Sequence, residues 1–373
     1  MRILINASVT GVIVNGFSVY CREMLRELLP LLEKRGHDVE LLIPRGSILE
    51  ELDVKKRYLP AICGMPRKRS PLNPVCRLLY NVFMLPFVTR RGDVVYSLTP
   101  HGTIWGSARQ VLTVHDLIPL EFPKQHRLQY YYTRLFLPKI LRHSKKVICI
   151  SDVTRQALTE RFPGAAADVT IIPNGCAREF QQRPDAKEHV LAKYSVVDYI
   201  LACGVGFPHK NVRTLIESYA KLPKELQSMH PLLVVGINTD PYAQGLMAFA
   251  ASLPCAANIK FAGMVAQSDL PDVYAAARLL VYPTLCEGFG MPPIESVRCG
   301  TPCLVSDIPI LRETLSMADE RYFDPHNSDD LAGKIINELS HEKTVDEDLV
   351  HRTDSYSWQR AAELALKALE EVQ

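Results

Sequence analysis

The first half of the chain alternates short apolar runs rich in β-branched residues with longer segments whose apolar residues recur every three or four positions. The short runs predict strands and the longer segments predict helices. Strands are expected at 2–6, 39–43, 94–98, 110–114, 146–150 and 169–173, and helices at 18–35, 75–88, 125–143 and 152–161. Strands that alternate with helices favour a parallel sheet with both faces covered.

The same alternation starts again after a polar stretch at about 180–196. Strands are expected at 199–204, 231–236, 258–263, 279–283 and 302–306, with helices that begin near 210, 241, 268 and 292. We therefore predict an α/β protein with two Rossmann-like, doubly wound parallel-sheet domains, 1–180 and 190–356. A last helix, 357–373, follows the alternation, and we expect it to cross back onto the first domain. Ligands of such sheets bind at the carboxyl ends of the strands, so the turns of two facing domains should line a central cleft.

Composition indicates an ordinary globular protein, with 47% hydrophobic and 23% charged residues. Ten cysteines are scattered without a CxxC pair or a histidine at metal-ligand spacing, so neither a disulfide nor a structural zinc is expected. The chain starts directly with a strand, and no apolar run reaches the length of a membrane span. We therefore expect a cytoplasmic location.

Charge is distributed unevenly along the chain. Residues 1–180 contain 26 Lys and Arg against 15 Asp and Glu, whereas the remainder contains 17 against 26. Segment 55–91 has nine basic residues and no acidic one, beside apolar and aromatic residues. This pattern suits peripheral contact with an anionic membrane surface, and a buried helix with a basic rim is the alternative. Nucleic acid is not expected as a partner, because the basic half lacks the motifs of the known binding modules.

The stretch CEGFGMPPIESVRCG, 286–300, places Glu287 and Glu295 on either side of a glycine turn that leads into a helix. Backbone N–H groups and the positive dipole end of this helix, at Gly290 and Met291, are suited to phosphate. Carboxylates only accept hydrogen bonds, so this pair suits the hydroxyls of a sugar and of a ribose. The alternative is a loop charge and a solvated helix residue.

A second turn, CGVGFPHKN, brings Lys210 and Asn211 to the start of a helix, where Lys210 would add positive charge near the same diphosphate. This turn is not a dinucleotide-binding fingerprint, because His209 occupies the position of the last glycine. The turn NGFSVY lets the backbone of Gly16 approach a ligand from the first domain.

A further turn, TVHDLIP, places His115 and Asp116 after a strand. A histidine at the carboxyl end of a strand is a site candidate, while Asp116 is expected to fix the turn. Ser151 is expected to cap the helix that begins at residue 152. The only D-x-D triplet, at 346–348, is expected to lie on a solvated helix face, so no metal ligands are assigned.

These turns together resemble the retaining nucleotide-sugar glycosyltransferases of glycosyltransferase family 4, which have the GT-B fold. The resemblance covers nearly the whole chain. EGFGMPPIE resembles the E-x7-E signature of the family, and TVHDLIP, IIPNG, HKN and SW are supporting matches in the expected order. The resemblance implies catalytic roles for Glu287, His115 and Lys210, and donor contacts from Gly16, Lys210, Asn211, Val265, Glu287, Phe289, Gly290, Met291 and Glu295.

Within this resemblance, Glu287 would contact donor-sugar hydroxyls, Glu295 the ribose, Lys210 the diphosphate and the backbone near Val265 the base. Two departures from the family pattern concern charge. Relatives have an arginine in this turn either after the glycine or directly before the lysine, and Val205 and His209 occupy these two positions. A titrating His209 could make the rate depend on pH. GFSVY also lacks the arginine of the N-terminal glycine loop of many relatives.

The resemblance further implies retaining hexosyl transfer without a metal or another cofactor. GDP-mannose is the first-choice donor, and a UDP- or dTDP-sugar is the alternative. The acceptor would be a lipid-linked saccharide of bacterial surface polysaccharide synthesis, at the inner face of the cytoplasmic membrane. A GT-B epimerase or phosphorylase and a sugar-nucleotide-binding scaffold without turnover are the competing interpretations.

Overall fold

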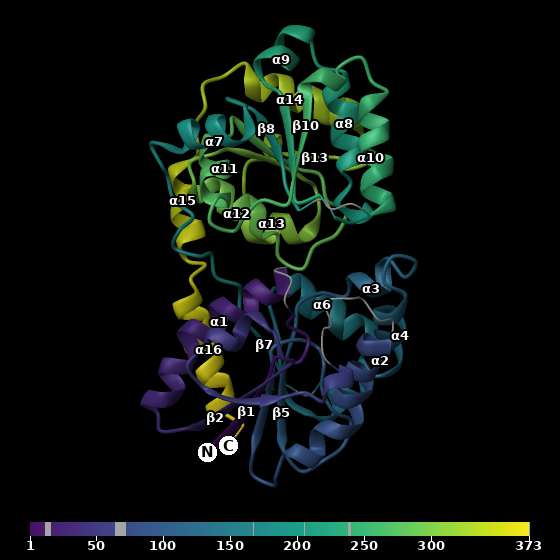
Figure 1. Cartoon of the computed structure of the whole chain (residues 1–373), viewed down its shortest axis with the longest axis vertical. Coiled ribbons are helices and arrows are strands. Elements are labelled where there is room, and N and C mark those ends of the chain that lie inside the picture. Colours follow the sequence, from purple (N-terminus) through teal and green to yellow (C-terminus); the bar gives the residue numbers. More distant parts are fainter. Residues whose placement is uncertain (12–15, 64–71, 167, 205, 238–239, 373) are drawn as a thin grey trace. The chain divides into compact units, whose positions relative to one another are not determined.

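A computed structural model describes residues 1–11, 16–63, 72–166, 168–204, 206–237 and 240–372. The chain divides into two compact units (Figure 1). Unit 1 comprises Met1–Gly175 and Tyr356–Gln373, and unit 2 comprises Cys176–Ser355.

Unit 1 is built on a parallel sheet of seven strands in the order β3-β2-β1-β4-β5-β6-β7. The strands are β1 (Arg2–Asn6), β2 (Asp38–Ile43), β3 (Lys55–Tyr58), β4 (Val94–Ser97), β5 (Arg109–Val114), β6 (Ser144–Cys149) and β7 (Val169–Ile171). In the centre of the sheet, Ile5 lies opposite Leu41 on one side and Tyr96 on the other. The central strands are apolar along most of their length because helices cover both faces of a parallel sheet.

The helices of unit 1 include one from the end of the chain. They are α1 (Gly16–Lys34), α2 (Leu72–Leu79), α3 (Ile118–Glu121), α4 (Arg127–Leu135), α5 (Leu137–His143), α6 (Asp152–Arg161) and α16 (Trp358–Glu370). Short 3-10 turns are η1 (Ile48–Glu51), η2 (Ala61–Cys63) and η4 (Leu85–Val88), and η3 (Tyr80–Met84) is a π-helix. Helix α16 packs on α1 in one buried cluster. A Cβ at Gly175 would lie 2.2 Å from the backbone nitrogen of Trp358, so the IIPNG and SW segments meet where only glycine fits.

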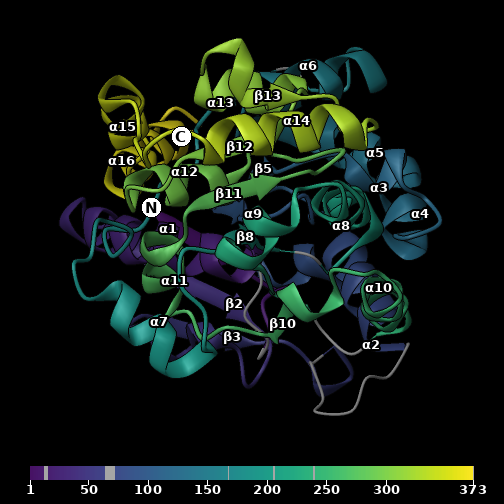
Figure 2. The same cartoon turned by 90° about the horizontal axis from the view of Figure 1, so that it is seen from above.

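Unit 2 has a parallel sheet of six strands in the order β10-β9-β8-β11-β12-β13 (Figure 2). The strands are β8 (Ile200–Ala202), β9 (Leu232–Val235), β10 (Ile259–Gly263), β11 (Leu279–Tyr282), β12 (Cys303–Ser306) and β13 (Tyr322–Phe323). The helices are α7 (Ala186–Tyr194), α8 (Val212–Ala220), α9 (Lys224–Met229), α10 (Pro241–Ala251), α11 (Leu270–Ala276), α12 (Met291–Arg298), α13 (Pro309–Leu315), α14 (Ser328–Leu339) and α15 (Glu347–Asp354). The 3-10 turns are η5 (Pro208–Lys210), η6 (Ala256–Asn258) and η7 (Asp319–Arg321).

The predicted α/β class with two parallel sheets is confirmed. The prediction of one continuous helix is wrong for two segments. The segment 75–88 is divided among α2, η3 and η4, and 125–143 is divided at Phe136 between α4 and α5. Pro86 and Pro138 lie in the first turns of η4 and α5. Proline has no N–H to continue a preceding helix but is tolerated in a first turn, which accounts for both breaks.

Candidate active site

The two turns expected to hold a diphosphate follow neighbouring strands of unit 2. The chain runs outward from β8 through β9 to β10 and then returns to β11, which pairs with the other side of β8. The order of the strands therefore reverses between β8 and β11. Doubly wound sheets bind ligands at the carboxyl ends of the strands at this switch point.

Lys210, at the end of η5, meets the turn after β11. Its Nζ donates to Glu287 Oε1 at 2.6 Å, and the hydroxyl of Tyr282 donates to the same oxygen at 2.6 Å. Lys210 Nζ also lies 3.4 Å from the Tyr282 hydroxyl. The side chains of Lys210 and Glu287 are only 19% and 10% exposed. The structure thus pairs the two predicted charged residues directly and adds Tyr282, which the sequence did not single out.

The carboxyl group of Glu287 is held in its charged form. Burial raises its pKa, but the positive charge of Lys210 and hydrogen bonds from Lys210, Tyr282 and Thr284 outweigh burial, and the pKa lies below its usual value. Burial and the nearby carboxylate raise the pKa of Tyr282 well above its usual range. Tyr282 therefore remains a hydroxyl donor at neutral pH.

The turn after Glu287 requires glycine where it enters α12. Gly290 has a φ of +88°, and a Cβ there would lie 2.5 Å from Leu311 Cδ2. No side chain caps this end of α12, which begins at Met291 rather than at the expected residue 292. The side chain of Phe289 is buried, so the backbone is the part of this residue suited to a ligand. The positive end of the helix dipole favours an anion at this position.

Glu295 lies about one turn inside α12 and has a different environment from Glu287. Burial raises its pKa to about 7; the hydroxyl of Tyr274 lowers the pKa, whereas the negative charge of Glu179 raises it further. The Tyr274 hydroxyl is also 3.3 Å from Cys203 Sγ, at the end of β8. Glu295 is thus held by a residue of α11 and changes charge near neutral pH.

Three other predicted residues lie in the turns of unit 2. Asn211 has a left-handed backbone, and its side chain donates to the carbonyl of Pro325 and accepts from Thr214 Oγ1, so it fixes the turn. His209 is buried and stacks on Phe207, and its carbonyl accepts the N–H of Leu285. Val265 comes two residues after the end of β10. Val205 lies outside the described residues, and the effect of His209 on the rate stays a prediction.

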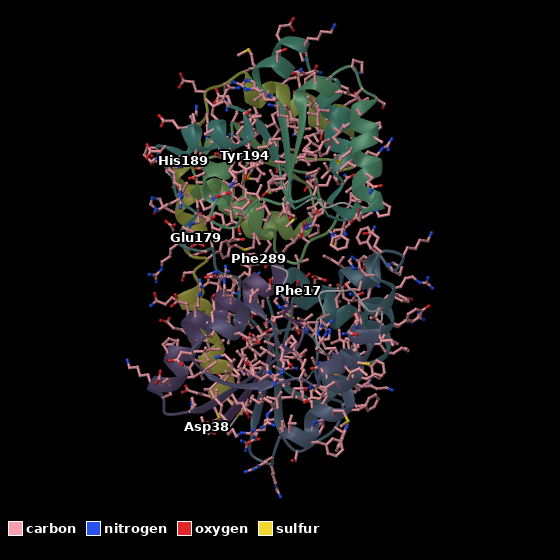
Figure 3. The ribbon with its side chains drawn as sticks, in the orientation of Figure 1. Phe17, Asp38, Glu179, His189, Tyr194 and Phe289 are labelled. Atoms are coloured by element: carbon pink, nitrogen blue, oxygen red, sulfur yellow. The ribbon has the colours of Figure 1, made fainter. Side chains whose placement is uncertain are left out.

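His115 follows β5 of unit 1 and is buried. Its Nε2 lies 2.8 Å from the carbonyl oxygen of Leu98, and the rings of Phe17 and Tyr20 contact it edge-on (Figure 3 labels Phe17). Burial lowers its pKa to about 4, while the hydrogen bond to Leu98 raises the pKa. His115 is therefore neutral at pH 7. Gly16 is the first residue of α1, and 12–15 lie outside the described residues.

Two expected supporting interactions of unit 1 are confirmed. Asp116 Oδ1 accepts the N–H of Ile118 and so fixes the turn after His115. Ser151 Oγ accepts the N–H of Thr154 and caps α6. Both residues serve the turns at the carboxyl edge of the sheet.

Two models of known protein families match this chain. The family model described as Glycosyltransferase Family 4 matches residues 14–180, and the model described as Glycosyl transferases group 1 matches residues 185–356. The chain belongs to the family 4 glycosyltransferases. This family retains the configuration of the transferred sugar.

Relatives of this glycosyltransferase include the O-antigen chain mannosyltransferase RfbU of Salmonella typhimurium, which is 29% identical over 75% of this chain and 76% of the relative. The serotype-specific mannosyltransferase WbdA of Escherichia coli is 28% identical over 77% of this chain, and this match spans 36% of WbdA. Among solved structures, sucrose-phosphate synthase from Thermosynechococcus elongatus has a TM-score of 0.79 at 19% identity, covering 100% of this chain and 99% of that chain. The last similarity shows the GT-B fold.

The glycosyltransferase has a second polar network at the switch point of unit 1, between β1 and β4. Asn6 Nδ2 donates to Asn81 Oδ1 at 2.7 Å and to Ser97 Oγ at 3.0 Å, and it lies 3.2 Å from the carbonyl oxygen of His101. Burial, with the charges of Arg77 and His115, lowers the pKa of His101 to about 3. The polar residue ending the apolar run RILIN was the one sequence signal for this network.

The described part of the chain has neither a cluster of metal ligands nor a membrane-spanning helix. No group of three or more His, Cys, Asp and Glu side chains there is arranged to hold a metal ion. The side chain of Asp346 caps α15 by accepting the N–H of Asp348. No helix in the described ranges combines the length and apolar character needed to cross a bilayer. Transfer without a metal stays a prediction.

Proposed function

We propose that this glycosyltransferase moves a hexose, with mannose from GDP-mannose as first choice, to a lipid-linked saccharide and forms an α-linkage. The product would enter bacterial surface polysaccharide synthesis. The observation that carries the proposal is the cluster of Lys210, Tyr282 and Glu287 beside the uncapped start of α12. It combines a cation, a helix dipole and a carboxylate, which are the groups that a sugar diphosphate requires.

In the proposed mechanism, the diphosphate of the donor competes with Glu287 for Lys210. The Glu287 carboxylate then accepts hydrogen bonds from sugar hydroxyls, while backbone N–H groups at Phe289, Gly290 and Met291 bind sugar and phosphate oxygens. Negative charge grows on the departing phosphate, and fixed donors and dipoles stabilise it without reorganisation. The departing phosphate takes the proton of the acceptor on the same face, so no enzyme nucleophile is required.

The remaining predicted contacts have supporting roles. Glu295 would accept the two hydroxyls of a ribose, and the backbone near Val265 would meet the base. Gly16 and neutral His115, both from unit 1, would lie against the donor. The side chain of Asn211 fixes the turn that carries Lys210 and would act on the donor through that turn.

Chemistry and the names of two relatives both support this choice of donor. A glutamate that bridges the 2′- and 3′-hydroxyls is better satisfied by ribose than by deoxyribose, which favours GDP- and UDP-sugars over dTDP-sugars. The names of RfbU and WbdA as mannosyltransferases favour mannose. A sugar-nucleotide-binding scaffold is the second candidate; it would also bind the donor, so measured sugar transfer separates it from a transferase.

The lipid-linked acceptor would bring the enzyme to the inner face of the cytoplasmic membrane. Segment 55–91 was the predicted contact, but several of its basic residues are used within unit 1. Lys56 Nζ donates to the carbonyl of Leu52, Arg57 pairs with Glu40, and Arg77 is buried. Residues 64–71 of this segment lie outside the described residues.

The test is the thermal unfolding midpoint of the full chain with UDP, GDP or dTDP. A ligand at 100 times its dissociation constant adds ~2.7 kcal/mol to stability. We expect GDP to give the largest shift in the unfolding midpoint. The second measurement is mannosyl transfer from GDP-mannose to a lipid-linked acceptor, with and without a chelator. A shift with UDP alone would move the proposal to a UDP-sugar. The absence of any shift would contradict the transferase site, and activity abolished by the chelator would contradict transfer without a metal.

A further inference from the structure

A row of apolar side chains in unit 1 faces solvent along α2, η3 and η4. Its members are Leu72, Val75, Leu79, Phe83 and Phe87, called here the apolar stripe. They are spaced by three or four residues and are between 37% and 70% exposed. An ordinary surface helix carries polar residues on its outer face, so these exposed apolar side chains indicate a contact surface.

The opposite face of the same segment fills the interior of unit 1. Val82 packs in a buried cluster with residues of α4 and α5, and Leu85 packs in another cluster with strand residues. The segment is therefore apolar on both faces, and among the described residues packing within unit 1 buries the inner face.

Aromatic contacts extend the apolar stripe onto neighbouring elements. The ring of Phe87 lies 5.2 Å from that of Trp105, which is itself exposed, and the ring of Phe83 lies 6.2 Å from that of Phe136 between α4 and α5. Tryptophan is favoured where an apolar surface meets the headgroup region of a bilayer. The exposed surface is thus broader than one helix.

The segments that carry the stripe and its aromatic neighbours on α4 and α5 contain basic residues and no acidic ones. Arg90 and Arg91 follow η4 and are exposed, as are the basic residues Arg134, Lys139 and Arg142 of the neighbouring α4 and α5. Residues 54–92 and 122–151 contain no Asp or Glu. Apolar side chains with surrounding Lys and Arg suit a surface that is apolar at depth and anionic at its rim, and an anionic lipid bilayer has both properties.

We propose that the apolar stripe inserts into the interfacial region of an anionic bilayer while the arginines and lysines beside it contact lipid headgroups. The purpose of this docking rests on the proposed function, because a lipid-linked acceptor lies at such a surface. The docking itself depends only on unit 1. The proposal assigns membrane contact to the apolar stripe and the basic residues beside it, rather than to all the basic residues of segment 55–91.

The experiment measures co-sedimentation of the full chain with vesicles of phosphatidylglycerol and phosphatidylcholine, and with vesicles of phosphatidylcholine alone. We expect the wild type to bind the anionic vesicles, with binding weakened by salt. The double variant Leu79→Ser/Phe87→Ser should lower the partition coefficient by about tenfold or more, because two apolar side chains no longer leave water. The matched control is Leu191→Ser/Met229→Ser, which alters two exposed apolar residues on α7 and α9 of unit 2 and should bind as the wild type does.

The outcomes separate the docking surface from the donor site. The variant Leu79→Ser/Phe87→Ser is called here the stripe variant. If nucleotide still raises its unfolding midpoint, the stripe variant is folded and binds nucleotide. Equal vesicle binding by the stripe variant and the wild type, or no binding by the wild type, overturns the docking proposal while leaving the donor site untouched. A dimer in sedimentation equilibrium that the stripe variant converts to monomer would instead make a second copy of the chain the occupant, and it would also overturn the proposal.

Discussion

Replacing Tyr282 with phenylalanine tests whether this tyrosine positions the charged pair of the donor site. The ring of Tyr282 is buried at 2% exposure, and phenylalanine keeps the ring, so the packing should be preserved. The substitution removes one hydroxyl, which donates to Glu287 Oε1 at 2.6 Å. Tyr282 is a positioning residue in this reasoning, because it acts through Glu287 and Lys210.

The magnitude follows from the type of hydrogen bond. A hydrogen bond to a charged group contributes ~1.5–3 kcal/mol. Lys210 and Thr284 still bind Glu287 in the variant, so the lower part of this range applies. At about 1.4 kcal/mol for each factor of ten, a loss of ~1.5–2 kcal/mol lowers kcat/KM roughly ten- to thirtyfold.

The pH profile separates positioning from a general loss of stability. The pKa of Glu287 is below its usual value, partly because Tyr282 donates to it, so the variant should have a higher Glu287 pKa. A lowered folded-state pKa adds stability that is present above the unfolded-state pKa and is lost as pH falls through the folded-state pKa. In the variant this contribution is smaller, and the acid limb of the kcat/KM profile moves to higher pH.

The assay is sugar transfer measured against pH, together with thermal unfolding. The control is Tyr219→Phe, which removes another buried hydroxyl of unit 2, one that donates to the carbonyls of Gln227 and His230. This control should lose stability without moving the acid limb. A Tyr282→Phe enzyme whose kcat/KM stays within about twofold of wild type, with an unmoved acid limb, would refute the reasoning.

Lys210→Ala should lower turnover by ~10²- to 10³-fold while the chain stays folded, as judged by unfolding and transfer assays, and near-normal turnover would contradict its role. Glu295→Gln should raise the unfolding midpoint at pH 8 and much less at pH 5. Burial raises the pKa of Glu295 to about 7, so the protonated carboxyl contributes stability below the unfolded-state pKa, and this stability is lost as pH rises through about 7. Equal midpoints of the variant and the wild type at pH 8 would contradict this pKa. Gly290→Ala should cost ~1–2 kcal/mol or more of unfolding free energy, measured in denaturant, because an alanine meets Leu311 at a positive φ; an unchanged midpoint would contradict this.

Short apolar runs predicted most strands of the two sheets, because parallel strands that are buried on both faces are apolar along most of their length. The same signal failed for β3, whose sequence KKRY is charged and pairs on one side with β2 at the edge of the sheet. An edge strand does not need a continuous apolar run, and charged residues are favoured there. The basic residues of this strand were assigned to a membrane surface, although Arg57 pairs with Glu40.

The candidate site was predictable where chemistry is local in sequence. The turn around Glu287 combines glycine, proline and two carboxylates within a few residues, which core packing does not explain. Tyr282 was not predictable, because a tyrosine that ends the apolar run LLVY is equally compatible with the core. Its partner Lys210 is 72 residues away, and only the pairing of β8 with β11 brings them together.

The π-helix η3 links the proposed membrane surface to the polar network of unit 1. Asn81 of η3 is buried and bonds Asn6 and Ser8 at the carboxyl edge of the sheet, while Phe83, two residues later, is exposed on the apolar stripe. Short π-helical segments are frequent at functional sites. Because Asn81 is hydrogen-bonded to Asn6 at the end of β1, insertion of the apolar stripe in lipid would hold this edge of the sheet at a fixed distance from the bilayer. A lipid-linked acceptor would then reach the edge from the bilayer, so the inward and outward faces of one short segment would serve the same transfer.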